Sequence, residues 1–320
     1  MILASLLLLV GFAILIKGAD FMVGGAASLA KKFNISNLAI GLTVVAFGTS
    51  APELVVNLIS SLNDKNDAAF GNVIGSNNFN ILLILGLAGT IYPLVVQRNT
   101  VKYEVPISIL AIFVLYILVN DQLIWGSGEN GLTRVDAIIL LCFFGLFMFY
   151  IYRTMRQSLD DDADGDVKQF GNLKSVGLII LGLAMLVGGG KLVVDNSIEI
   201  ALYYGLSEKL IGLTILAVGT SLPELATTAV AAYRKHTDIA IGNVVGSNIF
   251  NIFFILGITG TISPLTYNVA FNTDIYILVA ATVMLMIFMF TINQRKLDRW
   301  EAVILFCGYI VYTLYLVNGE

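Results

Sequence analysis

Apolar residues form ten long runs along the chain, separated by short polar or charged segments. The runs cover residues 2–30, 38–62, 67–92, 103–119, 133–153, 174–203, 209–233, 238–262, 274–292 and 299–317. About 20 predominantly apolar residues cross a bilayer as a helix. The pattern therefore predicts an all-α integral membrane protein with ten transmembrane helices. The first run continues past the length of a signal-peptide core, so we expect it to be retained as a helix.

Composition supports a membrane protein and disfavours several other classes. The chain is 58% hydrophobic and 12% charged, with a mean hydropathy of +0.87, whereas a soluble domain carries roughly 25% charged residues. A soluble enzyme, a nucleic-acid binder and a disordered protein are disfavoured. Cys142, Cys307 and His236 are too few for a disulfide framework, a histidine relay or a zinc site. We expect no enzyme activity, no cofactor and no nucleic-acid partner.

The basic residues alternate between the connecting segments, which predicts the orientation in the membrane. One side holds only Lys65, Arg134 and Lys209, while Lys17 and Lys191 lie within spans. The other side holds the remaining thirteen basic residues: Lys31, Lys32, Arg98, Lys102, Arg153, Arg156, Lys168, Lys174, Arg234, Lys235, Arg295, Lys296 and Arg299. A multi-pass protein of the cell membrane is expected, with both termini outside and the loop 154–173 in the cytoplasm.

An internal duplication divides the chain into two halves. IGLTVVAFGTSAPE (40–53) and GNVIGSNNFNILLILG (71–86) recur as IGLTILAVGTSLPE (211–224) and GNVVGSNIFNIFFILG (242–257). Every matched position is 171 residues from its counterpart. We predict a first repeat at 1–153, an acidic cytoplasmic loop at 154–173 and a second repeat at 174–320.

The number of spans in each half predicts how the repeats are related. Each half contains five runs, which is an odd number, so the second copy must enter the membrane in the opposite orientation. Inverted repeats place substrate and ion sites near the midplane, at interrupted helices in matching positions. The duplicated motifs lie in the second and third spans of each half, so we expect both of these spans to be interrupted.

The duplicated motifs combine helix breaks with acidic side chains. Pro52 and Pro223 lack an N–H, so they should free backbone carbonyls of the preceding turn. Glu53 and Glu224 follow directly, and a carboxylate at the membrane centre costs roughly 2.5 to 3.5 kcal/mol. No lysine or arginine lies in the neighbouring turns to offset that cost. The two glutamates are therefore candidate ion ligands.

The other polar residues of the motifs add neutral oxygen donors. They are Thr49, Ser50, Ser76, Asn77, Asn80, Thr220, Ser221, Ser247, Asn248 and Asn251. A site of oxygen ligands alone favours hard cations, and two carboxylates neutralise one divalent ion. Calcium is the natural candidate, and sodium can use subsets of the same oxygens. For the hydroxyl and amide side chains, helix packing with interhelical hydrogen bonds is the alternative interpretation.

At GTSAPE, GTSLPE, GSNNFN and GSNIFN, the sequence resembles the two alpha repeats of the sodium/calcium exchanger family, in its prokaryotic form. The resemblance implies ten helices, alternating access and exchange of Na⁺ for Ca²⁺. By position, Glu53 and Glu224 match the central calcium and sodium ligands, and Asn80 matches an amide ligand. Thr49 and Thr220 match backbone-carbonyl ligands. Four serines match peripheral sodium ligands: Ser50, Ser76, Ser221 and Ser247.

Asn251 departs from part of that family. It matches a position that is aspartate in some members, including potassium-dependent ones, so the centre here has two carboxylates instead of three. Proton-coupled relatives usually carry a GNA-type motif before the glutamate, in place of GTS and proline. A proton/calcium or other divalent-cation antiporter is the alternative function, and a cation channel is a more remote one.

An acidic stretch in the predicted cytoplasmic loop partly imitates a calcium-binding loop. Residues 160–166 place carboxylates and a glycine as at the start of an EF-hand, but Gly171 occupies the twelfth position, where a bidentate glutamate is expected. A solvated acidic loop is the preferred interpretation, and regulatory calcium binding is the alternative.

Overall fold

The computed structural model describes the chain except for residues 1, 127–128, 155–168, 205–216, 292–294 and 319–320. The described part is almost entirely helical, with four strands of two residues each. The acidic stretch 160–166 lies outside the described residues, so the prediction of a solvated loop or a calcium-binding loop is not tested.

The first half begins with the long helix α1 (Ile2–Phe33), and its other elements follow in short pieces. They are α2 (Asn37–Ile40), η1 (Gly41–Val45), α3 (Ala46–Thr49), α4 (Ala51–Leu62), α5 (Asn66–Asn78), η2 (Phe79–Ile84), α6 (Leu85–Ile91), β1 (Leu94–Val95), η3 (Thr100–Glu104), α7 (Val105–Val119), α8 (Asp121–Trp125), β2 (Gly131–Leu132) and α9 (Arg134–Thr154). The elements η1, η2 and η3 are π-helical.

The second half also begins with a 32-residue helix, α10 (Asn172–Tyr203). The elements after it are α12 (Ala217–Gly219), α13 (Leu222–Tyr233), α14 (Thr237–Ile249), η5 (Phe250–Leu256), α15 (Gly257–Ile262), β3 (Leu265–Thr266), η6 (Val269–Phe271), α16 (Asn272–Phe288), β4 (Lys296–Leu297) and α17 (Arg299–Asn318). The element η5 is π-helical and η6 is a short 3₁₀ turn.

Nine of the ten predicted spans have a counterpart among the described residues. Eight single helices are long and apolar enough to cross a membrane, and the pair Asn37–Thr49 and Ala51–Leu62 forms a ninth span that bends by 45°. The predicted run 209–233 begins outside the described residues, and its described part is α12 and α13. The described residues thus support a multi-pass helical membrane protein, whereas the count of ten stays a prediction.

The third span of each half differs from the sequence expectation of a second interrupted helix. Residues 66–91 and 237–262 each form one unbroken helical span. In place of a break, each contains a π-helical section, η2 in the first half and η5 in the second. Neither section contains a proline that would remove a backbone donor, so the ladder widens there without opening.

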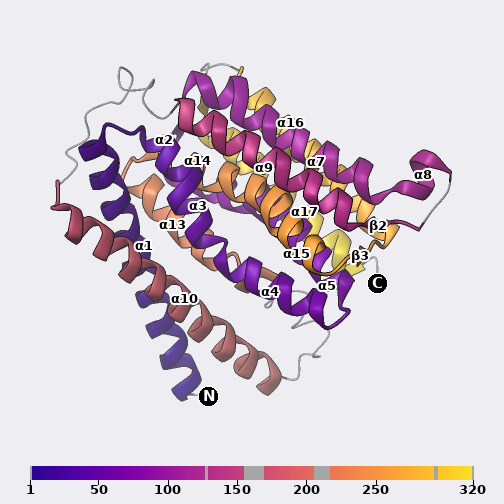
Figure 1. Cartoon of the computed structure of the whole chain (residues 1–320). Helices are drawn as coiled ribbons and strands as arrows, with labels where there is room; N and C mark the ends of the chain where they lie inside the picture. Colours follow the sequence, from indigo (N-terminus) through magenta and orange to yellow (C-terminus); the bar gives the residue numbers. More distant parts are fainter. Residues whose placement is uncertain (1, 127–128, 155–168, 205–216, 292–294, 319–320) are drawn as a thin grey trace.

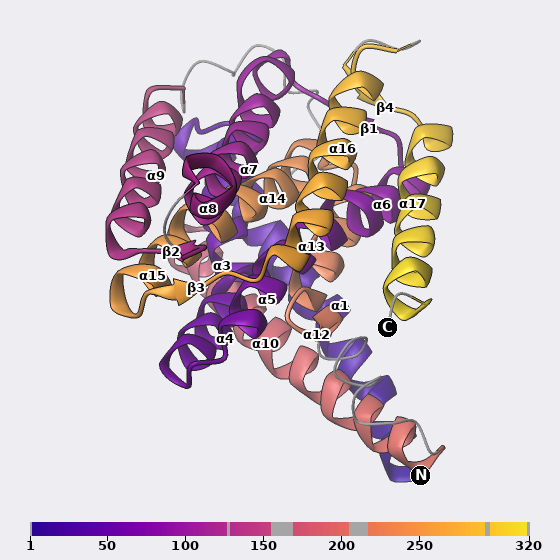
Figure 2. The ribbon, with the colours of Figure 1, turned by 90° about the vertical axis from the view of Figure 1, so that its right-hand side faces the viewer.

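The spans that carry the duplicated motifs lie at the centre of the molecule. Residues 237–262 are almost completely buried, and residues 66–91 are mostly buried. In Figures 1 and 2, α9, α16 and α17 lie around them. Each of these three helices has exposed apolar side chains, such as Phe149, Ile287 and Val311. A soluble protein would bury such side chains, whereas lipid solvates them.

Short strand pairs connect the two halves. Leu94 pairs with Leu297 in the antiparallel pair β1–β4, and Leu132 pairs with Leu265 in the pair β2–β3. In both pairs, the segment after the third span of one half pairs with the segment before the fifth span of the other. The connections are therefore reciprocal.

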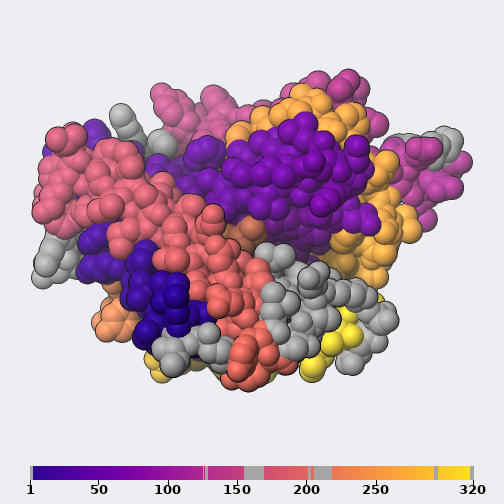
Figure 3. Space-filling model, turned by 90° about the horizontal axis from the view of Figure 1, so that it is seen from below, coloured from indigo at the N-terminus to yellow at the C-terminus, as the bar shows by residue number. Residues whose placement is uncertain are grey.

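The helices α1 and α10 cross on one side of the molecule, as Figure 3 shows from below. Their backbones approach closely at glycines. A Cβ added to Gly182 would lie 2.7 Å from the Gly18 carbonyl oxygen and 2.8 Å from the Met22 nitrogen. Small residues permit this kind of approach between membrane helices.

We expect Gly182→Ala to destabilise the protein by about 1 to 3 kcal/mol, because the added methyl group meets backbone atoms that cannot rotate away. Gly188→Ala on the same helix is the matched control, since no atom lies within 4 Å of the added Cβ. It should leave stability unchanged or raise it by about 1 kcal/mol. Thermal unfolding followed by circular dichroism in detergent measures both, and equal melting temperatures would contradict the packing argument.

Candidate functional site

The second span of the first half breaks at Ser50, two residues before Pro52. The helix α3 ends at Thr49, and α4 begins at Ala51 with the proline in its first turn. A missing N–H costs nothing at that position, since first-turn donors have no partner within the helix. Ser50 has φ −83° and ψ 6°, outside the helical range, and the axis bends there by 45°.

The second half repeats this geometry at Ser221, which has φ −89° and ψ 7°. The helix α12 ends at Gly219, and α13 begins at Leu222 with Pro223 in its first turn. The sequence prediction that each proline marks a helix break is confirmed in both halves.

Glu53 and Glu224 lie in the first turns of α4 and α13, and each side chain is 1% exposed. Among the described residues, no lysine or arginine forms an ion pair with either one. A helix N-terminus carries partial positive charge, which offsets part of the cost of burying a carboxylate. The remaining compensation must come from hydrogen bonds or from a bound cation.

Each glutamate accepts a hydrogen bond from the serine at the helix break of the other half. Ser50 Oγ lies 2.9 Å from Glu224 Oε1, and Ser221 Oγ lies 3.1 Å from Glu53 Oε1. Both bonds join residues more than 160 positions apart. They bring the two carboxylates into one centre formed by both halves.

The serines of the third spans complete each of these contacts. Ser247 Oγ lies 3.0 Å from Ser50 Oγ, and Ser76 Oγ lies 3.0 Å from Ser221 Oγ. All four serines are almost completely buried. A hydroxyl can both donate and accept, so each serine pair can reorient its protons when the charge at the carboxylate changes.

Four asparagines join the third spans across the centre. Asn80 donates to Asn248 Oδ1 at 2.9 Å, and Asn251 donates to Asn77 Oδ1 at 3.0 Å. Asn77 and Asn248 also exchange hydrogen bonds with each other's backbone carbonyl, at 3.2 and 3.3 Å. These bonds use the amide nitrogens as donors and hold the side chains of Asn80 and Asn251 in fixed orientations.

Four buried oxygen atoms of the centre have no hydrogen-bond partner. They are Oε2 of Glu53, Oε2 of Glu224, Oδ1 of Asn80 and Oδ1 of Asn251. They form two pairs of equivalent atoms, 171 residues apart. An unsatisfied buried polar group costs roughly 1 to 3 kcal/mol. Carboxylate and amide oxygens are ligands of hard cations, so bound cations could satisfy these atoms.

A second layer of polar residues holds the glutamate backbone in place. Asn72 donates to the Glu53 carbonyl at 3.3 Å and to Asn57 Oδ1 at 2.6 Å. Asn243 donates to the Glu224 carbonyl at 3.4 Å and to Thr228 Oγ1 at 2.9 Å.

The hydroxyls of Thr49 and Thr220 contact this second layer. Thr49 Oγ1 lies 3.1 Å from Asn243 Oδ1, and Thr220 Oγ1 lies 3.2 Å from Asn72 Oδ1. These contacts use the hydroxyl protons and orient the two threonines beside the centre.

The structure brings together the carboxyl, hydroxyl and amide side chains that the sequence singled out. The glutamates and the four serines form two hydrogen-bonded groups, one around each carboxylate. Asn80 and Asn251 belong to a third group with Asn248 and Asn77, and the two threonines contact Asn72 and Asn243 beside the glutamates. Sequence reasoning gave no role to Asn72 and Asn243. Their recurrence in GNVIGS and GNVVGS, at the same offset of 171, was the signal that could have identified them.

Several charged groups outside the centre have partners of their own. Asp20 pairs with Lys17 at 3.5 Å, as their spacing predicts, and also with Arg234. The buried carboxylates of Glu104 and Glu301 accept hydrogen bonds from Tyr150 and Thr291. No group of three or more histidine, cysteine or acidic residues suited to a metal occurs among the described residues. The centre instead relies on two carboxylates and neutral oxygens.

Comparison with known proteins identifies the family. The family model "Sodium/calcium exchanger protein" matches residues 3–153 and 174–318. The chain is 36% identical to the putative antiporter CaxA of Alkalimonas amylolytica, over the full length of both. It is 32% identical to the sodium/calcium exchanger MaX1 of Methanosarcina acetivorans, with 97% of each chain covered.

Comparison with solved structures identifies the same family. The sodium-calcium exchanger NCX_Mj, soaked with 2.5 mM Na⁺ and 0.1 mM Ca²⁺, matches with a TM-score of 0.82, 32% identity and 99% coverage of each chain. The fold agrees with that of a transporter whose structure has been solved, and the matched regions include both duplicated motifs. The chain belongs to the sodium/calcium exchanger family, a family of cation antiporters.

Proposed function

We propose that this protein is a secondary active antiporter that exchanges Na⁺ for Ca²⁺ across the membrane. The observation that carries the proposal is the set of four buried, unpartnered oxygens around Glu53 and Glu224. Two carboxylate charges balance one Ca²⁺ or two Na⁺, so the two ions can replace each other without leaving the buried acids uncompensated. Membership of the exchanger family supports the same assignment.

The proposed ion ligands are the residues that the sequence singled out. Glu53, Glu224, Asn80 and Asn251 supply the central oxygens. Thr49 and Thr220 contribute backbone carbonyls, and the serines Ser50, Ser76, Ser221 and Ser247 contribute to sodium sites. Because the same carboxylates serve both ions, Ca²⁺ and Na⁺ compete for overlapping sites.

The proposed transport cycle uses two inverted repeats that rock against each other, so that the centre faces one side of the membrane at a time. The central hydrogen bonds recur at an offset of 171 residues, and the strand pairs β1–β4 and β2–β3 are reciprocal. Both features support a two-fold relation between halves of five spans each. In this proposal both termini lie outside, and the loop 154–173 is cytoplasmic.

The coupling ion can be tested by flux measurements in proteoliposomes. We expect calcium uptake to follow an imposed sodium gradient, to saturate, and to require the counter-transported ion. Uptake driven by a pH gradient without sodium would assign proton coupling instead. Uptake that neither saturates nor needs a counter-ion would indicate a channel.

The role of the carboxylates can be tested with Glu53→Gln and Glu224→Gln. Each variant keeps the shape of the side chain but removes one of the two charges that balance a divalent ion. We expect calcium binding to weaken at least roughly 10-fold, as for loss of a charged hydrogen-bonding group, and calcium exchange to fall to background.

Glu129→Gln is the matched control, because Glu129 is exposed and lies away from the centre. It should transport at the normal rate. Calcium titration and flux assays measure all three variants, with size-exclusion profiles as a check on folding. Normal exchange by both central variants would refute the proposed ligand set.

Asn251, which matches an aspartate in some members of the family, generates a separate prediction. Asn251→Asp adds a third carboxylate to the centre, so we expect half-maximal exchange at a lower sodium concentration. Asn251→Ala is the control, since it removes the hydrogen bond to Asn77 without adding charge. The sodium dependence of calcium flux distinguishes them, and identical curves for the aspartate and native proteins would contradict the charge argument.

A further inference from the structure

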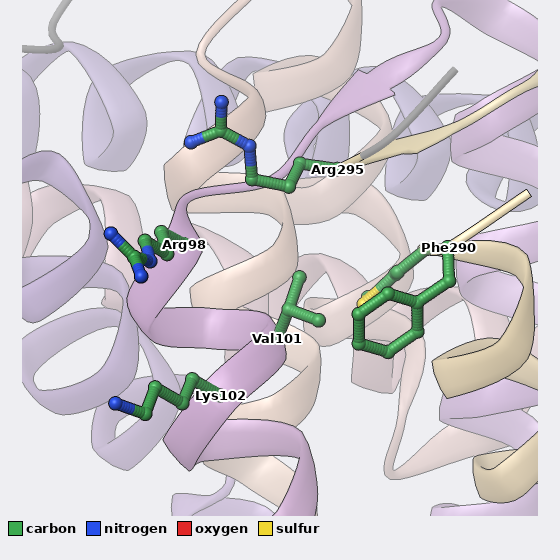
Figure 4. A pocket seen from close by; sticks show the side chains of 6 residues that line it. Arg98, Val101, Lys102, Phe290 and Arg295 are labelled. Atoms are coloured by element: carbon green, nitrogen blue, oxygen red, sulfur yellow. The ribbon is translucent and has the colours of Figure 1, made fainter.

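A cavity of about 430 Å³ lies between the start of the fourth span and the segment that follows α16. Its lining combines three basic and three apolar residues: Arg98, Val101, Lys102, Met289, Phe290 and Arg295. Figure 4 shows the basic ends of Arg98, Lys102 and Arg295 extending toward the same side of the view, with Phe290 on the other side. The cavity thus has a cationic side and an apolar side.

The backbone holds Arg295 close to the segment that carries Arg98. Arg295 accepts a hydrogen bond from Val96 N and donates one to the Met289 carbonyl, each at 2.8 Å. Its φ of 63° lies in the left-handed region, which residues other than glycine seldom adopt. The two bonds and the adjoining β1–β4 pair hold this conformation. The backbone contacts of the fold therefore fix the position of Arg295 at the cavity.

The three cations have no acidic partner among the described residues. The ion pairs there involve Lys17, Arg234 and Lys296, and no acidic side chain lines the cavity. Lys102 lies 5.1 Å from the ring of its neighbour Tyr103, a contact that leaves its charge unneutralised. All three cations are exposed, so water screens part of their mutual repulsion, and an anion bound among them would offset the rest.

The apolar side shows which kind of anion fits. Met289 is fully buried and Val101 nearly so, but Phe290 is 63% exposed at the end of a membrane-spanning helix. A soluble anion would use only the cations. A phospholipid would place its phosphate among the cations and its acyl chains along the exposed apolar surface, in the way that basic pockets between membrane helices bind lipid head groups.

We propose that this cavity binds the phosphate group of an anionic phospholipid, from the leaflet that faces the basic side of the protein. The site is separate from the ion centre, since none of its six lining residues belongs to that centre. It does not depend on which ions are exchanged.

Tryptophan fluorescence provides a local test. The chain contains two tryptophans, and Trp300 packs on Phe288 at 5.8 Å, next to Met289 of the cavity. In a Trp125→Phe background, Trp300 is the only tryptophan. We expect brominated phosphatidylglycerol diluted into phosphatidylcholine to quench it more strongly than brominated phosphatidylcholine at the same mole fraction.

The preference should disappear when Arg98→Gln, Lys102→Gln and Arg295→Gln are combined, because each basic residue near an anionic lipid contributes about fivefold in affinity. The matched control combines three exposed basic residues on the same predicted side: Lys31→Gln, Lys32→Gln and Arg153→Gln. It should retain the preference. Equal loss in both triple variants would mean that only general surface charge acts, and the proposal would be overturned.

Two further measurements keep the test decisive. The double variant Arg98→Gln and Lys102→Gln leaves the left-handed Arg295 in place, so it serves as the test if the triple variant does not fold. Its affinity for phosphatidylglycerol should fall about 25-fold. Millimolar inorganic phosphate should leave the quenching unchanged, and its reversal by phosphate would assign a soluble anion instead.

The acidic stretch of the same chain is the remaining competitor for the cavity. Replacing its five aspartates, Asp160, Asp161, Asp162, Asp164 and Asp166, by asparagine should leave the lipid preference unchanged. A clear gain in preference would identify that stretch as the occupant and overturn the proposal.

Discussion

Two buried carboxylates without basic partners are the constraint on which this structure depends. Glu53 and Glu224 are each 1% exposed, in the middle of a helical membrane protein where water cannot solvate them. Their position in the first turn of a helix places them near partial positive charge. One oxygen of each accepts a serine hydrogen bond, while the other has no protein partner. The fold therefore leaves negative charge and oxygen atoms without a partner, and a cation can compensate both.

The position of the helix breaks follows from the same constraint. A continuous helix would use its backbone donors and acceptors internally and would present no N-terminus at membrane depth. The proline in each GTS-x-P-E motif lies in the first turn of a new helix, which starts two residues before the glutamate. The break supplies the dipole, places a serine where it can reach the other half, and frees backbone carbonyls. A single sequence feature thus serves three physical purposes.

Neither half can form the centre by itself. The serine at each break donates to the glutamate of the opposite half, and the asparagines of the third spans bond to each other across the interface. Any movement of one half against the other must therefore change the surroundings of both carboxylates together. Hydrogen bonds between the halves thus couple the position of each half to the surroundings of the carboxylates, which is what the proposed alternating access requires.

Much of the fold and of the centre follows from the sequence by itself. The apolar runs identified nine spans that the structure describes, because bilayer thickness dictates helix length. The constant offset of 171 and the proline positions identified the breaks and the glutamates, since both depend on local backbone chemistry. Only the tertiary structure decided that the third spans stay continuous through π-helical turns, and that Asn72 and Asn243 support the glutamate backbone. It also decided which oxygens stay unpartnered, because that depends on contacts between residues more than 140 positions apart, and such contacts leave no pattern along the chain.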